Sequence, residues 1–93
     1  MILEVALLNI KIGKQDVFEQ NFEQASKIIS AMKGYINHKL KKCIEQENQY
    51  ILLLNWNTLE DYELDFRKSP EYQEWKKLAH HFYEPFPQVL HHT

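Results

Sequence analysis

The stretch QYILLLNWN, residues 49 to 57, has the composition of a β-strand and is apolar on both of its faces. Ile51 and Leu53 occupy one set of alternate positions, and the other set holds Leu52, Leu54 and Trp56. Successive side chains of a strand point to opposite faces of a sheet, so we expect this strand to be buried on both faces.

The N-terminal segment repeats this pattern. In residues 2 to 12, one set of alternate positions holds Leu3, Val5 and Leu7, and the other holds Ile2, Ala6, Leu8, Ile10 and Ile12. Gly13 closes the run, which predicts another strand buried on both faces. Residues 35 to 46 are more polar and predict a half-exposed strand, joined to residues 49 to 57 by a tight turn at Glu47 and Asn48.

Two helical regions separate these strands. Asp16 and Glu19 form a D-x-x-E pattern that we expect to cap a helix ending at Gly34. Its apolar positions recur every three or four residues and form one face: Phe18, Phe22, Ala25, Ile29 and Met32. After the strand at 49 to 57, Thr58 is expected to cap a short helix with Leu59, Tyr62 and Phe66 facing inward.

The segment SPEYQEWKKLAHHFYEPFP, residues 69 to 87, predicts a further helix, with Ser69 as the N-cap and Pro70 at the first helical position. One face of this helix is apolar and comprises Tyr72, Trp75, Leu78, Ala79 and Phe82. His80 and His81 fall at the opposite margins of that face. Two prolines end the helical region, and PQVLHH, residues 87 to 92, is expected to form an edge strand.

The resulting order, β-α-β-β-α-α-β over residues 1 to 93, predicts one α+β domain with an antiparallel sheet and its helices on one side. The strands at 2 to 12 and 49 to 57 then leave an apolar sheet face that the helices do not cover. A monomer rarely exposes an apolar patch of that size. We therefore expect a homodimer in which two such faces pack together.

Composition narrows the class of protein. The chain has 93 residues, 44% of them hydrophobic and 26% charged, which is typical of a globular domain. A net charge of −2 offers no basic surface for nucleic acid. No apolar run is long enough to cross a membrane, and the N-terminal residues lack the pattern of a signal peptide. The single cysteine, Cys43, fits a reducing compartment, so a cytoplasmic location is expected.

Three segments carry a resemblance to a known family: MILEVALLNIKIG, LLLNWNTLEDY and FRKSPEYQEWKKLAHHFYEPFPQV. Together they resemble the antibiotic biosynthesis monooxygenase domain family, and most closely a branch of small stand-alone bacterial proteins. The resemblance implies a ferredoxin-like βαββααβ protomer, two of which form a dimeric α+β barrel. It also implies diverse chemistry, because some members oxidise phenols or anthrones with O2 and no cofactor, others oxidise quinols, and others bind or degrade haem.

The resemblance implies site residues as well. Trp56 and Tyr62 match, in type and spacing, a tryptophan and a tyrosine that line the pocket of the polyketide-oxidising members. Leu52 stands where those members carry an asparagine, so the third residue of that site is not retained. Phe66 and Lys76 stand near the positions of the pocket tryptophan and the histidine ligand of the haem-degrading branch, so neither of these is retained.

Oxygenation without a cofactor requires a flat substrate to lose a proton, so that its anion can give an electron to O2. The protein must supply a dry aromatic cleft and groups that hydrogen-bond to or stabilise the anion. We expect Tyr62 and Trp56 to be catalytic. The substrate-binding candidates are Phe66, Arg67, Trp75, His80 and His81. Aromatic residues at helical spacing also form ordinary cores, and that alternative stays open for each of them.

The five histidines do not form a metal-binding pattern, because no H-E-x-x-H or H-x-x-x-H spacing occurs. We therefore expect no metal, and the resemblance to the cofactor-independent members implies no other cofactor. The leading hypothesis is a cofactor-independent monooxygenase acting on a small aromatic, phenolic or quinol compound. Two alternatives are a non-catalytic ligand-binding or stress-response protein of the same fold, and a haem-binding protein with a histidine ligand.

Overall fold

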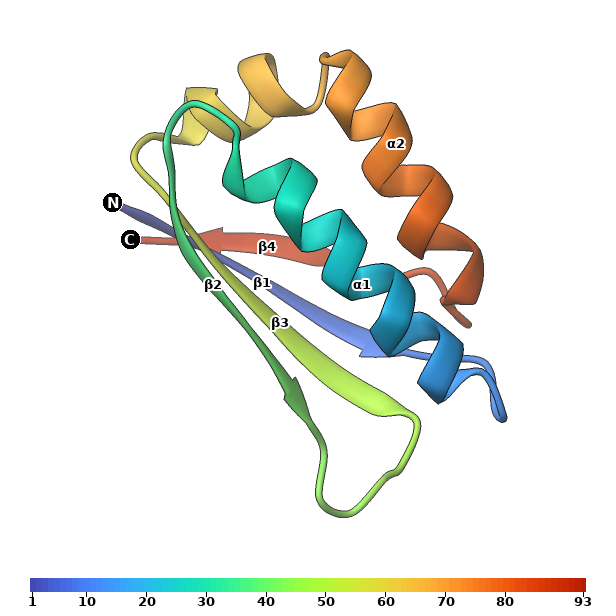
Figure 1. The fold of residues 1–93 in the computed structure, drawn as a ribbon. Helices are drawn as coiled ribbons and strands as arrows, with labels where there is room; N and C mark the ends of the chain where they lie inside the picture. The colour runs from blue at the N-terminus through green and yellow to red at the C-terminus, as the bar shows by residue number, and fades with distance from the viewer.

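The computed structural model describes all residues, 1–93, and contains a four-stranded antiparallel sheet with two α-helices on one of its faces (Figure 1). The elements follow in the order β1 (Ile2–Asn9), α1 (Gln15–Ser30), β2 (Tyr35–Lys42), β3 (Gln49–Trp56), η1 (Asp61–Phe66), α2 (Pro70–Ala79), η2 (His80–Phe82) and β4 (Val89–His92). The sheet order is β2-β3-β1-β4, which confirms the ferredoxin-like α+β protomer expected from the sequence. Neither α-helix is long and apolar enough to span a bilayer.

The register of the sheet decides which side chains meet on the helix-covered face. β1 pairs with β3 so that Ala6 faces Leu52, and it pairs with β4 so that Glu4 faces His91. Side chains at these positions point toward the helices, and most of them are buried. The sheet side of the core contains Ala6, Leu8, Ile10, Tyr50, Leu52, Leu54 and Trp56, and the helices add residues such as Phe18, Phe22, Ile29 and Trp75.

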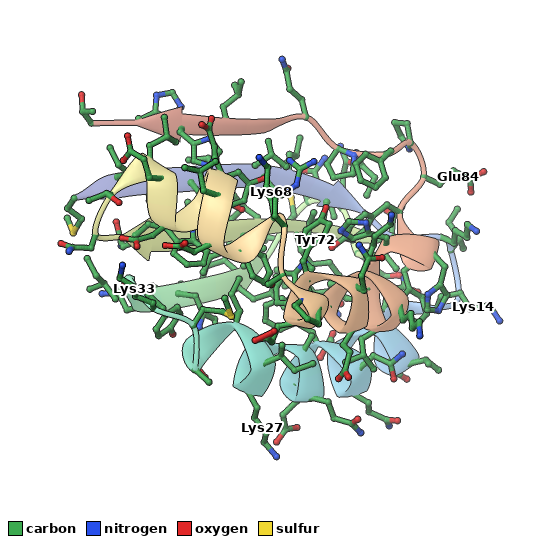
Figure 2. The ribbon with its side chains drawn as sticks, turned by 90° about the horizontal axis from the view of Figure 1, so that it is seen from above. Lys14, Lys27, Lys33, Lys68, Tyr72 and Glu84 are labelled. Atoms are coloured by element: carbon green, nitrogen blue, oxygen red, sulfur yellow. The ribbon has the colours of Figure 1, made fainter.

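The opposite face of the sheet has no helix over it (Figure 1). Its apolar side chains are partly or largely exposed in the single chain, with Leu7 at 48% and Leu90 at 46%. The same face carries Leu3, Val5, Ile51 and Leu53. By contrast, Lys27 of α1 points away from the sheet, as Figure 2 shows. The uncovered apolar face expected from the sequence is therefore present.

Two of the predicted helix starts are confirmed. The Ser69 hydroxyl accepts a hydrogen bond from the Tyr72 backbone N–H at 3.1 Å, with Pro70 at the first helical position. Thr58 and Asp61 form a reciprocal pair, in which the Asp61 N–H donates to the Thr58 hydroxyl and the Thr58 N–H donates to the Asp61 carboxylate. Gly34 lies against Asp61 with a φ of +84°, and a Cβ there would come within 2.1 Å of the Asp61 Cγ. Only glycine fits this approach.

Several predicted boundaries are wrong. Asp16 does not cap α1, because the helix begins at Gln15 after Lys14 and has no side-chain cap. That helix also ends at Ser30, before Gly34. The first strand ends at Asn9, and Ile12 is 88% exposed in the turn before Gly13. β2 ends at Lys42 rather than at residue 46, because its partner strand β3 begins only at Gln49, whose carbonyl accepts one further hydrogen bond from the Cys43 N–H.

Candidate functional site

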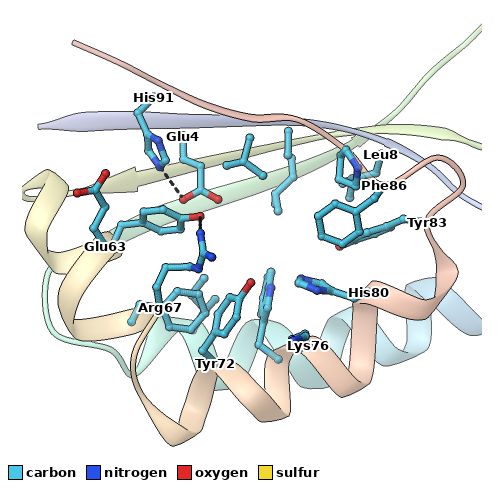
Figure 3. Close-up of a pocket in the computed structure, with 18 residues that line it drawn as sticks. Glu4, Leu8, Glu63, Arg67, Tyr72, Lys76, His80, Tyr83, Phe86 and His91 are labelled. Atoms are coloured by element: carbon cyan, nitrogen blue, oxygen red, sulfur yellow. Dashed lines mark hydrogen bonds and ion pairs between the residues drawn. The ribbon is translucent and has the colours of Figure 1, made fainter.

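A cavity of about 730 Å³ lies between the helix-covered face of the sheet and the segment from η1 to β4 (Figure 3). Four parts of the chain supply most of its wall. They are β1 with Glu4, Ala6 and Leu8; η1 and its end with Tyr62, Glu63, Phe66 and Arg67; α2 with Tyr72, Trp75 and Lys76; and the C-terminal segment with His80, Tyr83, Phe86, Pro87, Val89 and His91. Its wall thus combines aromatic and aliphatic side chains with several charged and imidazole groups.

A buried carboxylate forms part of this wall. Glu4 is only 6% exposed, and its Oε1 accepts a hydrogen bond from the Trp56 indole N–H at 3.0 Å. The Nε2 atom of His91 lies 3.3 Å from the same oxygen. Burial raises the pKa of Glu4, while Trp56, His91 and the positive charge of Arg67 oppose part of that rise. Glu4 is therefore a stronger base than an exposed glutamate.

Tyr62 and Arg67 form a second polar group. Arg67 Nη1 donates to the Tyr62 hydroxyl oxygen at 3.3 Å, and the guanidinium lies 5.2 Å from the centre of the Tyr72 ring. Burial and the negative charge of Glu4 raise the pKa of Tyr62, and Arg67 opposes this. Tyr62 therefore keeps its proton at neutral pH. Because Arg67 donates to the Tyr62 oxygen, the Tyr62 O–H remains free to donate to a molecule in the cavity.

The π-helical geometry of η1 explains why these two residues meet. The Arg67 backbone N–H donates to the carbonyl of Tyr62, five residues earlier. In a regular α-helix, residues five apart would point about 140° apart. The wider π turn brings Arg67 over the Tyr62 ring, with 5.8 Å between the guanidinium and the ring centre.

His80 lies on another side of the cavity, among aromatic rings. Its ring centre is 5.1 Å from that of Phe86, 5.5 Å from that of Tyr83 and 5.9 Å from that of Tyr72. Burial, together with the positive charges of Lys76 and Arg67, lowers the pKa of His80 to about 4. His80 is therefore neutral at pH 7, and it is a weak base.

The predicted site residues divide into three groups. Tyr62, Phe66, Arg67, Trp75 and His80 all line the cavity. Trp56 does not line it: the indole is 0% exposed and lies behind the wall, where its N–H holds Glu4. His81 is exposed outside the cavity, with its ring 4.1 Å from that of Phe82.

Sequence reasoning missed Glu4, Tyr72, Lys76, Tyr83 and His91 as parts of the wall. Glu4 carried a detectable signal, because it is a charged residue on the same parity as buried apolar residues of β1. His91 carried none, because its position opposite Glu4 depends on β4 pairing with β1. No three His, Cys, Asp or Glu side chains are grouped closely enough to hold a metal ion.

Comparison with known proteins assigns the family. The model of the antibiotic biosynthesis monooxygenase family matches residues 1–78. The uncharacterized protein YczJ of Bacillus subtilis is 56% identical over 91 residues, which cover 98% of this chain and 96% of YczJ. The chain belongs to the antibiotic biosynthesis monooxygenase family. Within that family, a solved structure from Bordetella bronchiseptica is 32% identical, has a TM-score of 0.93, and is matched over 99% of this chain and 94% of its own.

A more distant solved structure shares the fold alone. SnoaB of Streptomyces nogalater, described as a cofactor-independent oxygenase, is 14% identical to this chain with a TM-score of 0.77. The match covers 98% of this chain and 87% of SnoaB. The ferredoxin-like arrangement is thus retained where most side chains differ.

Proposed function

We propose that this antibiotic biosynthesis monooxygenase family member is a cofactor-independent monooxygenase that acts on a small aromatic, phenolic or quinol compound. The observation that carries the proposal is the combination, in one cavity, of aromatic walls with the Tyr62–Arg67 pair and a buried carboxylate. A volume of about 730 Å³ lies within the usual range for a small-molecule site. SnoaB, which has the same fold, is a cofactor-independent oxygenase.

The chemistry begins with loss of a substrate proton. The resulting anion gives one electron to O2, the two radicals combine to a peroxide, and loss of water leaves a carbonyl. Tyr62 donates its free O–H to the anionic substrate oxygen, and Arg67 adds a positive charge behind it. Such donors, held in place before the reaction, stabilise charge as it develops in a site that excludes water.

Oxygen uptake tests this proposal. An oxygen electrode would follow protein treated with a chelator and mixed with a panel of anthrones and hydroquinones. We expect saturable O2 consumption with at least one of these compounds, above the rate in buffer. Binding of the panel without any O2 consumption would instead support a non-catalytic ligand-binding protein. A stoichiometric Soret band on titration with haem would support the haem-binding alternative.

We further propose that two copies pack their uncovered sheet faces together. The face includes Leu3, Val5, Leu7, Ile51, Leu53 and Leu90. A stable pair would bury roughly 1,600 Å² or more in total. Light scattering at micromolar concentration should give twice the chain mass of 11.2 kDa. Leu53→Asp should dissociate the pair, whereas Ile44→Asp, at a 94% exposed position in the connection between β2 and β3, should not. A stable wild-type monomer would overturn this proposal.

A further inference from the structure

The geometry points to Glu4 as the group that takes the substrate proton, with Trp56 and His91 as the residues that position it. This inference rests on the proposed function, because it names the base for that reaction. Glu4 lines the cavity from β1, while Trp56 approaches it from β3 and His91 from β4. Figure 3 shows Glu4 on the sheet side of the cavity, across from Arg67 and Tyr72.

The two carboxylate oxygens of Glu4 have different surroundings. Oε1 takes the Trp56 N–H at 3.0 Å and lies 3.3 Å from His91 Nε2. No protein hydrogen bond reaches Oε2. Since no fully buried side-chain oxygen or nitrogen of the structure lacks a partner, Oε2 must be accessible, and Glu4 lines the cavity. One oxygen is therefore held, and the other is open to a ligand.

The other titratable groups of the cavity suit this role less well. The pKa of His80 is lowered to about 4, and the charges of Lys76 and Arg67 disfavour a further positive charge there. Tyr62 keeps its proton, and its O–H serves as a hydrogen-bond donor to the substrate oxygen. A base is more effective as its pKa approaches the working pH, and burial moves the pKa of Glu4 in that direction.

Glu4 acts first as a base and then as an acid in the proposed reaction. The substrate C–H or O–H bond breaks, its electron pair stays on the substrate, and the proton goes to Glu4 Oε2. After O2 has accepted an electron and combined with the substrate radical, Glu4 returns its proton to the peroxide anion. Loss of water from that peroxide then gives the carbonyl product. The His91 side chain is 19% exposed, so His91 also connects Glu4 to solvent.

This arrangement favours a particular class of substrate. The molecule needs an acidic proton to reach Glu4 and an oxygen to accept the Tyr62 O–H. Anthrones meet both needs, because an acidic CH2 group and a ketone oxygen lie on opposite sides of one ring. They also present flat faces to rings such as Phe66 and Trp75 in the cavity wall.

Deuterium exchange without O2 isolates the proton transfer. An anthrone would be incubated anaerobically with protein in D2O, and mass spectrometry would follow deuterium entering the CH2 group above the rate in buffer. We expect Glu4→Gln to slow this exchange at least 100-fold, while quenching of Trp75 fluorescence shows that the anthrone still binds. Glu47→Gln is the matched control, because Glu47 is an exposed glutamate that does not line the cavity. It should exchange at the wild-type rate.

The outcomes separate this inference from the proposed function. Exchange that depends on Glu4 without any O2 uptake would support the base and overturn the monooxygenase. Unchanged exchange in Glu4→Gln, with O2 uptake intact, would overturn Glu4 as the base and leave the monooxygenase standing. Absence of both activities in the wild type would overturn both. If Glu4→Gln does not fold, Glu4→Asp withdraws the carboxylate by one methylene and should slow exchange at least tenfold; an unchanged rate would overturn the inference.

Discussion

Replacing Trp56 by phenylalanine removes the indole N–H that holds Glu4 while keeping an aromatic ring in the core. A hydrogen bond to a charged group contributes about 1.5 to 3 kcal/mol. The lost part of the indole adds about 1 kcal/mol for the cavity it leaves. Because Trp56 is 0% exposed, water does not replace either interaction. We expect Trp56→Phe to lower the free energy of unfolding by about 2.5 to 4 kcal/mol at pH 8.

Urea unfolding of four proteins measures this effect: wild type, Trp56→Phe, Glu4→Gln and the double variant. Tryptophan fluorescence provides the signal, from Trp75 in all four proteins and also from Trp56 in the two that retain it. One fixed protein concentration is needed if the chain dimerises. A glutamine at position 4 still accepts the indole N–H but carries no charge. We therefore expect a coupling energy of about 1 to 2 kcal/mol between the two changes. Additive losses would refute the link between Trp56 and Glu4.

The same variant should alter the pH dependence of turnover. Loss of the Trp56 N–H removes an interaction that favours the Glu4 carboxylate, so the pKa of Glu4 rises further. Turnover requires the ionised carboxylate and increases with pH through that pKa, so the rising limb should move to higher pH in Trp56→Phe. The titratable and charged groups that face Glu4 are Tyr62, Arg67, Tyr83 and His91. If the rising part of the pH–turnover curve does not move in Trp56→Phe, Trp56 is only a core residue.

Three further changes test other parts of the cavity. Tyr62→Phe should lower turnover by roughly 10- to 1,000-fold, because the substrate loses a hydrogen-bond donor. Tyr35→Phe, outside the cavity, should leave turnover unchanged. Equal turnover in Tyr62→Phe and the wild type would mean that Tyr62 only packs in the core. In chemical denaturation, Trp75→Ala should lower the free energy of unfolding by about 3 to 5 kcal/mol, and His81→Ala by under about 1 kcal/mol. Equal losses would contradict the burial of Trp75 and the exposure of His81. The folded-state pKa of His80, about 4, lies below the ordinary 6.5, so its contribution to stability is present above pH 6.5 and is lost as the pH falls toward 4. His80→Gln should reduce the loss of unfolding free energy between pH 6.5 and 4 by about 1 to 2 kcal/mol. If the unfolding free energy depends on pH in the same way in His80→Gln as in the wild type, His80 is not a buried neutral imidazole.

The fold was predictable where a local pattern carries the information. Alternation in β1 and β3 requires no knowledge of neighbours, so the strands and the uncovered apolar face follow from it. Ser69 before Pro70 marks a helix start by its own chemistry. The Asp16 pattern failed because a D-x-x-E spacing does not determine where the preceding turn ends, and here Lys14 occupies the capping position.

The site was only partly predictable, because it depends on which strands are neighbours. The meeting of Glu4 with Trp56 and His91 requires both the sheet order and the register. One regular helix over this segment would place His80 and His81 at opposite margins of its apolar face. In fact α2 ends at Ala79 and η2 begins at His80, so His80 turns into the cavity and His81 to the outside. The π-helical turn that joins Arg67 to Tyr62 likewise has no signal in the local sequence.

Isotope labelling tests the proposed monooxygenase most directly. Protein treated with a chelator would turn over an anthrone under 18O2 in unlabelled water, and mass spectrometry would measure the label in the product. We expect one 18O atom in each quinone formed, with the second oxygen atom of O2 released as water and no accumulation of hydrogen peroxide. An unlabelled product accompanied by stoichiometric hydrogen peroxide would show electron transfer to O2 without oxygen insertion, and would contradict the proposed monooxygenase.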